Sequence, residues 1–392
     1  MANSAPIERP TQSIIRSDLL GLFRGAIAVV LEVLLEQEVR EMVGARRYER
    51  MGSRKDHLNG TYMRRLLTSM GLLELDVPRT RTQGSPLETI GRYSRRTSEI
   101  DEMVTSAYVQ GVSTRDMSRV TEALMGERVG RSTVSRVTQR LTEKVEGLRK
   151  APITEGFPYL FLDATFINAR WARAVEDVSV LVAYGVDEDG KRRLLAVTLG
   201  SEESEASWTA LLEELLERGL SGPKLVVSDA HAGLIKAVRR LFPEVPHQRC
   251  TVHLTRNVLA KTPHRLRGRV AGELSKIFQA ATRQSAQKAL EDFASGLGAQ
   301  IPEALSCLRD GFAAATRFYD FPRAHWPRIR SNNGLERLNA EIKRRVRAVG
   351  AFPDRDSALR LITAVALEVT AVWGQRRYLD MALLGQKDPK AA

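Results

Sequence analysis

The chain of 392 residues is poor in cysteine and has no long uninterrupted apolar run. Two cysteines cannot form a disulfide framework, which fits a reducing cytoplasmic setting. The most apolar N-terminal stretch, residues 19–39, is broken by Arg24, Glu32 and Glu36. It is therefore typical of an amphipathic or buried helix, and neither a membrane span nor a signal peptide is expected. Internal repeats and low-complexity tracts are also lacking.

Positive charge, in contrast, is abundant. The formal net charge is +13, and the composition of 43% hydrophobic and 27% charged residues is that of a globular chain long enough for two or three domains. A soluble protein this basic usually meets a polyanion, most often nucleic acid. A merely basic solvated surface is the alternative, and charge alone does not exclude it.

The N-terminal part predicts a helix over residues 13–43 and a basic, glycine-punctuated loop over 44–65. A short strand is expected in LLELDVPRTR, ending at Pro78. From residue 158 to 252 the sequence pattern changes from helical spacing to apolar strand-like runs. It predicts three successive strands, a helix over 204–218, a strand in KLVVSDA, a helix over 231–241 and a short strand in EVPHQRC. Strand hairpins followed by strand–helix alternation favour an α/β sheet with helices packed on it.

Residues 111–141 predict two short helices around a glycine turn. Ser113 or Thr114 would cap a helix over 115–124, and Ser132 would cap a second helix from Thr133 to about residue 141. This pattern is typical of a helix-turn-helix, although a structural helical hairpin is the alternative. The N-terminal end of the second helix would then meet DNA through Arg131, Ser132, Thr133, Ser135 and Arg136.

Two carboxylates fall where a sheet would bring them together. Asp163 interrupts the apolar run YLFLDATF, and Asp229 ends the apolar run KLVVSD. Ligands bind at the carboxyl ends of strands in open α/β sheets, and burying an unpaired carboxylate is costly. Two adjacent strands would place these like charges together, so either a pKa rises or a cation such as Mg²⁺ lies between them. A metal ion, not a side chain, is the partner expected for Asp163.

A third acidic candidate comes from RIRSNNGLERLNAEIKRRVR. Glu336 lies near the start of a predicted helix that Asn332 or Asn333 would cap. Spacing alone does not separate it from Glu341, which would pair with arginines one turn away.

The segments FLDATF, VVSDAHAGLIKAV, QRCTVHLTRN and IRSNNGLERLNAEIKRR, in this order, resemble the bacterial Mutator-type insertion-sequence transposases, a DDE family with an RNase H-like core. The likeness runs from about residue 72 to 353. It implies that Asp163, Asp229 and Glu336 form the catalytic, metal-binding triad. It also implies two Mg²⁺ ions, which Mn²⁺ can replace, that serve DNA strand cleavage and strand transfer.

The same resemblance implies double-stranded DNA partners, namely the terminal inverted repeats of the element and the target. It further implies a homodimer in the bacterial cytoplasm, associated with the nucleoid and not with a membrane. An all-helical insertion would interrupt the core. Further contacts to the DNA backbone are expected from the basic residues of the insertion and of the Glu336 region: Lys261, Arg265, Arg267, Arg269, Arg330, Arg337, Lys343 and Arg344. For the four residues of the insertion, an ordinary solvated face is the alternative.

Cys250 and His253 stand in C-x-x-H spacing, but two ligands do not make a tetrahedral zinc site. They and His231 are candidates for lining the active site. Trp326 lies beside arginines and is the candidate aromatic contact to DNA, whereas Trp208 is expected in a helix core.

The predicted organisation is a multidomain α/β protein. A helical, basic segment (1–66) precedes a helix-turn-helix-type region (67–150), and the RNase H-like mixed sheet flanked by helices (151–252 and 326–392) is interrupted by the insertion (253–325). Two rival functions stay open: a DNA-binding regulator without catalysis, and an RNase H-type nuclease that cuts without joining.

Overall fold

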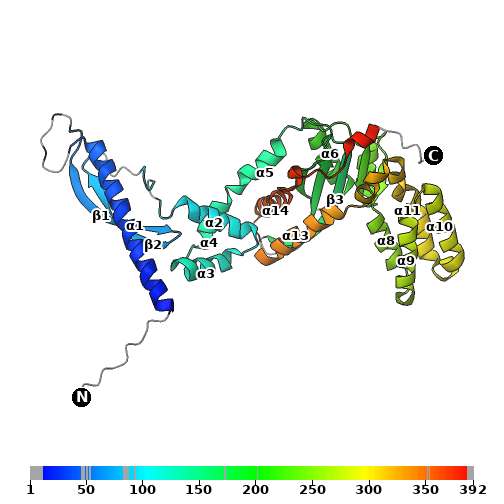
Figure 1. The fold of residues 1–392 in the computed structure, drawn as a ribbon, viewed down its shortest axis with the longest axis horizontal. Helices are drawn as coiled ribbons and strands as arrows, with labels where there is room; N and C mark the ends of the chain where they lie inside the picture. The colour runs from blue at the N-terminus through cyan, green and yellow to red at the C-terminus, as the bar shows by residue number, and fades with distance from the viewer. Residues whose placement is uncertain are drawn as a thin grey trace, which may run out of the picture. The chain divides into compact units, whose positions relative to one another are not determined.

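The computed structural model describes residues 12–45, 49, 52, 54–82, 88–91, 94–171, 174–200, 202–350, 352 and 354–385. The side chains of 12–18 and 169–176 are outside this description. The chain divides into two compact units, Met1–Thr138 and Gln139–Ala392, whose elements are labelled in Figure 1.

The first unit begins with a helix packed on a two-stranded hairpin. Helix α1 (Gln12–Val43) confirms the predicted long helix, and β1 (Leu58–Thr68) pairs antiparallel with β2 (Gly71–Thr80). The side of α1 that faces the hairpin buries Leu35 against the strands, and Ile27, Ala28 and Leu31 pack on the same cluster. The two strands and α1 together enclose a small hydrophobic core.

Two local predictions fail in this hairpin. The expected loop over 44–65 is wrong from Leu58 onward, because β1 occupies that part of it. In β1, Arg64 faces inward between Tyr62 and Leu66, whereas the apolar Met63 faces outward, so the sequence lacks the regular apolar alternation of a strand. The second strand also continues past Pro78 to Thr80.

Three helices complete the first unit: α2 (Ser98–Val109), α3 (Thr114–Met125) and α4 (Arg131–Thr138). The Ser113 hydroxyl accepts a hydrogen bond from the amide of Asp116, so the predicted cap of the first helix is confirmed.

The predicted cap of the second helix is wrong. Helix α4 begins at Arg131 and ends at Thr138, which places Ser132 inside the first turn. The carbonyl of Gly130 accepts hydrogen bonds from the amides of Thr133 and Val134 instead.

The second unit contains a five-stranded mixed sheet, and its strands confirm those predicted from the sequence. The strand order is β5-β4-β3-β6-β7. Strand β4 pairs antiparallel with both β3 and β5, whereas β6 and β7 continue parallel to β3. The bounds are Tyr159–Trp171 for β3, Ala174–Val186 for β4, Arg192–Gly200 for β5, Leu225–Ser228 for β6 and His247–Arg249 for β7.

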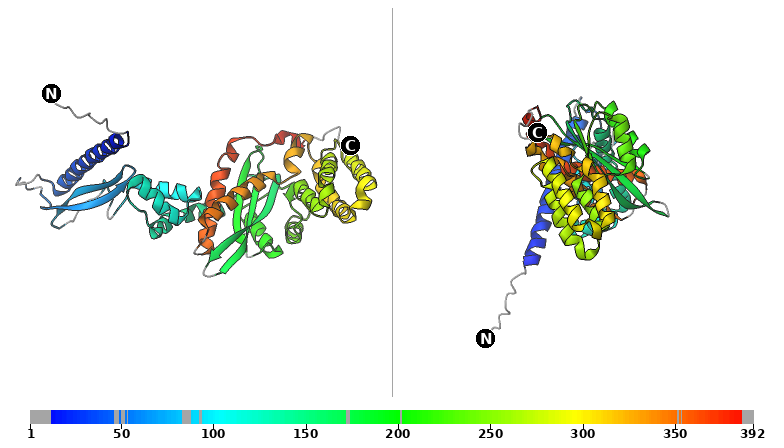
Figure 2. Two further views of the ribbon diagram at one scale, coloured as in Figure 1. Left: turned by 90° about the horizontal axis from the view of Figure 1, so that it is seen from below. Right: turned by 90° about the vertical axis from the view of Figure 1, so that its right-hand side faces the viewer.

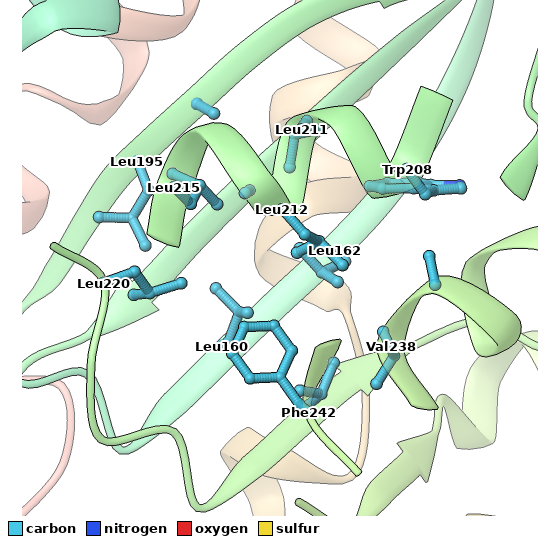
Figure 3. Packing of buried hydrophobic residues seen from close by; sticks show 14 of the residues in the cluster. Leu160, Leu162, Leu195, Trp208, Leu211, Leu212, Leu215, Leu220, Val238 and Phe242 are labelled. Atoms are coloured by element: carbon cyan, nitrogen blue, oxygen red, sulfur yellow. The ribbon is translucent and has the colours of Figure 1, made fainter. Parts of the chain in front are cut away.

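One face of the sheet is covered by α6 (Glu205–Glu217) and α7 (Ala232–Leu241). Leu160 and Leu162 of β3 point into this layer and join one core cluster with Trp208, Leu212 and Val238 (Figure 3). Trp208 is fully buried, which confirms its expected place in a helix core. Because side chains alternate along a strand, residues 159, 161, 163 and 165 of β3 face the other side.

The other face meets α13 (Asn333–Val349), which packs on β3, and α14 (Arg355–Thr370), which packs on α13, β5 and α5 (Leu141–Lys150) (Figure 2). The Phe161 and Tyr184 rings stack here with centroids 4.4 Å apart. Residues 355–375 are long and apolar enough to cross a membrane by length and composition. Their packing against this unit accounts for that composition, as in the core helix of a soluble protein.

Between β7 and α12 (Trp326–Ile329) the chain is helical, as the sequence predicts. The inserted helices are α8 (Thr251–Ala260), α9 (Arg267–Phe278), α10 (Arg283–Leu297) and α11 (Pro302–Ala315). Gln248 of β7 fixes them to the sheet: its amide nitrogen donates to the Ala315 carbonyl at 2.8 Å, and its amide oxygen accepts from the Phe318 amide at 2.7 Å.

Leu212→Ala should destabilise the second unit by roughly 2–5 kcal/mol, because the fully buried leucine leaves a cavity between α6 and β3. Val372→Ala is the matched control, since Val372 is 55% exposed and its truncation should change stability by less than about 0.5 kcal/mol. Thermal unfolding followed by circular dichroism checks this. Equal melting temperatures for the two variants would contradict the assigned core.

Candidate active site

The sheet brings the two strand carboxylates to the same level. Phe161 of β3 is paired with Val227 of β6 in parallel register, so Asp163 and Asp229 each stand two residues further along. Asp163 is 5% exposed and points away from the Leu162 layer, whereas Asp229 follows the end of β6 and is partly exposed. The predicted meeting of these two carboxylates agrees with the register.

Helix α13 is tied to this edge through Asn332, which stands at its N-cap position. The Asn332 side chain makes no capping bond to the helix; its amide nitrogen donates to the Leu162 carbonyl at 2.7 Å. The backbone amide of Asn332 donates to Cys250 Sγ at 3.3 Å. The start of α13 is therefore fixed against β3 and against the start of α8.

One side chain of α13 reaches Asp163 directly. Asn339 Nδ2 donates to Asp163 Oδ2 at 2.8 Å, and both groups are buried. The expectation that only a metal ion would be the partner of Asp163 is thus wrong. Glu336 lies three residues before Asn339, on the same face of the helix.

The surroundings of the two glutamates on α13 differ. Glu336 Oε1 lies 2.7 Å from Arg256 Nη1 and 3.7 Å from His253 Nε2. Glu341 instead forms ion pairs with Arg344 and Arg345 at 2.9 and 3.4 Å, which lower the pKa of its carboxyl. The negative charge of Glu336 is among the causes that raise the pKa of Asp163, so the geometry favours Glu336 as the third carboxylate.

A fourth carboxylate, Glu203, joins the site and was missed from the sequence. Its side chain is 11% exposed, and Oε1 accepts a hydrogen bond from Trp208 Nε1 at 3.2 Å and lies 3.5 Å from His231 Nδ1. Burial, followed by the charge of Asp229, raises the pKa of Glu203. Glu203 stands just before the Ser204 cap of α6, and the packing of α6 against α7, the helix that follows β6, brings it to Asp229.

Like charges dominate the electrostatics of the site. The pKa of Asp163 is raised well above its ordinary value, first by burial and then by Asp229, Glu336 and Glu203. Such a cluster is costly unless protons or cations neutralise it.

The oxygen donors fit a hard divalent cation such as Mg²⁺. Within the described part of the chain, no three histidine, cysteine or acidic side chains are placed to hold one metal ion together. Glu336 is instead paired with Arg256. The chemistry of the donor set therefore fits a divalent cation, although the side chains are not arranged around one.

The other predicted lining residues take positioning roles in this structure. The His231 backbone amide donates to Asp229 Oδ1 at 3.0 Å, and His231 is the N-cap residue of α7 rather than its first helical residue. Cys250 is a fully buried free thiol at the N-cap of α8, and burial raises its pKa.

The predicted basic contacts are distributed over three helical regions. Most are exposed: Arg131, Ser132 and Arg136 on α4; Lys261, Arg265, Arg267 and Arg269 around the start of α9; and Arg337, Lys343 and Arg344 on α13. Thr133 is partly exposed.

Two predicted DNA contacts are instead engaged inside the fold. Arg330 donates from Nη1 to the Phe278 carbonyl at 3.1 Å. Trp326 packs edge-on against Tyr319 and donates from Nε1 to the Phe321 carbonyl at 2.7 Å. Packing of the insertion accounts for both side chains.

The sheet holds the buried Asp163 inside β3 level with the partly exposed Asp229 after β6, which defines the class of α/β proteins with an acidic site in the sheet. The family model described as "Transposase, Mutator family" matches residues 3–376. The chain belongs to the Mutator family of transposases, and it is an enzyme of DNA transposition.

Curated relatives agree over nearly the whole chain. The transposase for insertion sequence element ISRM5 of Rhizobium meliloti is 37% identical, covering 91% of this chain and 90% of that one. The transposase for IS406 of Burkholderia multivorans is 35% identical over 94% and 95% of the two chains, and that for IS256 in transposon Tn4001 of Staphylococcus aureus is 34% identical over 91% and 93%.

Among solved structures, the Drosophila P element transposase strand transfer complex is 12% identical, covers 77% of this chain and 86% of that one, and has a TM-score of 0.32. Values this low do not demonstrate a shared fold.

Asp163→Asn should raise the melting temperature of the metal-free protein at alkaline pH, because an ionised carboxylate with a raised pKa destabilises the folded state. It should also weaken the stabilisation by Mn²⁺. Melting curves in EDTA and across a Mn²⁺ titration measure both effects. Glu341→Gln, outside the cluster, should be stabilised by Mn²⁺ as much as the wild type is. If Mn²⁺ stabilised Asp163→Asn equally, Asp163 would not be a ligand of the metal ion.

Proposed function

We propose that this transposase uses a DDE-type site, made by Asp163, Asp229 and Glu336, for divalent-metal-dependent cleavage and transfer of DNA strands. The observation that carries the proposal is the buried Asp163, whose pKa is raised first by burial and then by the charges of Asp229, Glu336 and Glu203. The strand order, with three antiparallel strands followed by two parallel ones, supports an RNase H-like core.

The chain's own residues would prepare this site for a phosphodiester. Asn339 orients Asp163, the amide of His231 orients Asp229, and Asn332 fixes the helix that carries Glu336. When bound by the triad, two Mg²⁺ ions would supply Lewis-acid activation of the attacking oxygen and stabilise the leaving oxygen, and Mn²⁺ would replace them. These hydrogen bonds keep the carboxylates in place, so that little reorganisation is needed during the reaction.

The proposed partner is double-stranded DNA, both the terminal inverted repeats of the element and the target. Exposed cations on α4, α9 and α13 support contacts to phosphates. We also propose a homodimer that pairs two element ends in the bacterial cytoplasm, at the nucleoid. The predicted domain boundaries remain part of this proposal.

Two alternative functions predict different results. A regulator without catalysis would bind DNA but need no divalent metal, and a nuclease of RNase H type would cut without joining. The family membership and the arrangement of Asp163, Asp229 and Glu336 favour the transposase.

Asp163→Asn, Asp229→Asn and Glu336→Gln should each reduce cleavage and joining of a labelled element-end duplex by more than about 100-fold in Mg²⁺, with DNA binding retained. Each change removes a charged metal ligand while nearly preserving the shape of the side chain. Product formation is measured on denaturing gels, and binding is measured by mobility shift.

Glu341→Gln is the matched control on the same helix, because its carboxylate pairs with Arg344 and Arg345 and not with the site. It should keep near-wild-type activity. An active Glu336→Gln variant would remove the third ligand from the proposal, and wild-type binding without any product would favour the regulator.

Arg267→Ala should weaken binding to all DNA sequences and lower the slope of log affinity against log salt by about 1, because it removes one phosphate contact. Lys276→Ala, on the same helix, removes a cation that already pairs with Glu273 at 2.8 Å and should leave the slope nearly unchanged. Fluorescence-anisotropy titrations at several salt concentrations measure both slopes. Identical slopes for wild type and Arg267→Ala would place α9 away from the DNA.

A further inference from the structure

Helix α1 presents an apolar face on the side that does not pack on the hairpin. Its large side chains are between 44% and 72% exposed. We call this face the apolar stripe; its residues are Leu19, Leu22, Phe23, Val29, Val30, Val33 and Leu34, with the exposed Ala26 at its centre. Large contiguous apolar patches are rare on soluble monomers and mark interaction surfaces.

The spacing of the stripe is that of a helix-pairing seam. Leu19, Leu22, Ala26, Val29 and Val33 follow one another at alternating intervals of three and four residues. This is the seam of a coiled coil, in which apolar residues at every third and fourth position meet an equivalent helix. The spacing therefore fits a helical partner along several turns of α1.

The remainder of α1 is already used within the first unit. Ile27, Ala28 and Leu31 pack on the hairpin cluster. Glu32 accepts a hydrogen bond from the Asp76 amide at 2.8 Å, and Glu38 accepts one from the Glu88 amide at 2.6 Å. The hairpin and the segment at Glu88 thus bind these two acidic residues of α1, while the opposite face holds the stripe.

Among the described side chains of α1, the lack of charge on the stripe argues against DNA and a lipid surface as its occupants. Its members are all uncharged, and it ends at the exposed ion pair of Glu36 with Arg40, whose charges cancel. A polyanion requires lysines or arginines at the contact, and a helix lying on anionic lipid requires them on its flanks. An apolar, uncharged helix face is complementary to another apolar, uncharged helix face.

We propose that the apolar stripe of α1 is a docking surface for the same stripe on a second copy of this chain, so that two α1 helices pair. The contact is isologous, which lets one surface complement itself about a twofold axis. The exposed side chains amount to several hundred Å² per helix, on the order of the 800 Å² per partner of a standard interface. This pairing rests on the homodimer of the proposed function, to which it assigns a surface, and it does not depend on the catalytic residues.

Leu22→Glu tests the pairing, because a carboxylate in the seam of each copy would be desolvated and would repel its counterpart. The matched control is Leu124→Glu: Leu124 of α3 is 71% exposed against 72% for Leu22, and it lies outside the stripe. Size-exclusion chromatography with light scattering of the full chain gives the mass. Wild type and Leu124→Glu should have the mass of two chains, and Leu22→Glu should dissociate with a dissociation constant raised at least about 100-fold.

Mixing Leu22→Glu with Leu22→Lys copies should restore the dimer, which a variant that had merely unfolded would not do. Circular dichroism should give equal helix content for the variants and the wild type. A monomeric wild type at micromolar concentration, or a Leu22→Glu variant that is as dimeric as Leu124→Glu, would overturn the proposal.

Discussion

A carboxylate inside a β-sheet has to be compensated, and the second unit is arranged around this requirement at Asp163. Its neighbour Leu162 fills the apolar layer beneath α6, so alternation forces Asp163 to the opposite face. On that face, α13 brings Asn339 to the carboxylate and Asn332 to the strand backbone. The polar groups of one helix thus offset part of the cost of burying this carboxylate.

This arrangement explains how a large helical insertion can interrupt the core without disturbing the site. The amide and hydroxyl of Thr251, where the insertion begins, both bond to the carbonyl of Arg330, where it ends, at 2.9 and 3.0 Å. The two ends of the insertion are therefore joined directly beneath α13. Because the cost of closing a loop grows slowly with its length, the insertion can be long while its ends remain fixed.

The sequence predicts those features of the structure that depend on residues close to one another in the chain. The apolar runs of β3 and β6, the cap at Ser113 and the length of α1 follow from neighbouring residues, and so does the presence of Asp163 and Asp229 at strand positions. The missed features depend on contacts between distant segments. Asn339 and Asp163 are 176 residues apart, and Glu203 reaches Asp229 through the packing of α6 on α7.

The distribution of charge has a consequence for how DNA could enter the site. The exposed surfaces of α9 and α13 carry cations, whereas the site holds four carboxylates. On the proposed function, phosphates are attracted to the surface but repelled by the centre until positive charge neutralises it. Arg256, at 2.7 Å from Glu336, supplies one such charge already. Entry of the scissile phosphate and neutralisation of the carboxylates are therefore coupled, and weakening one should weaken the other.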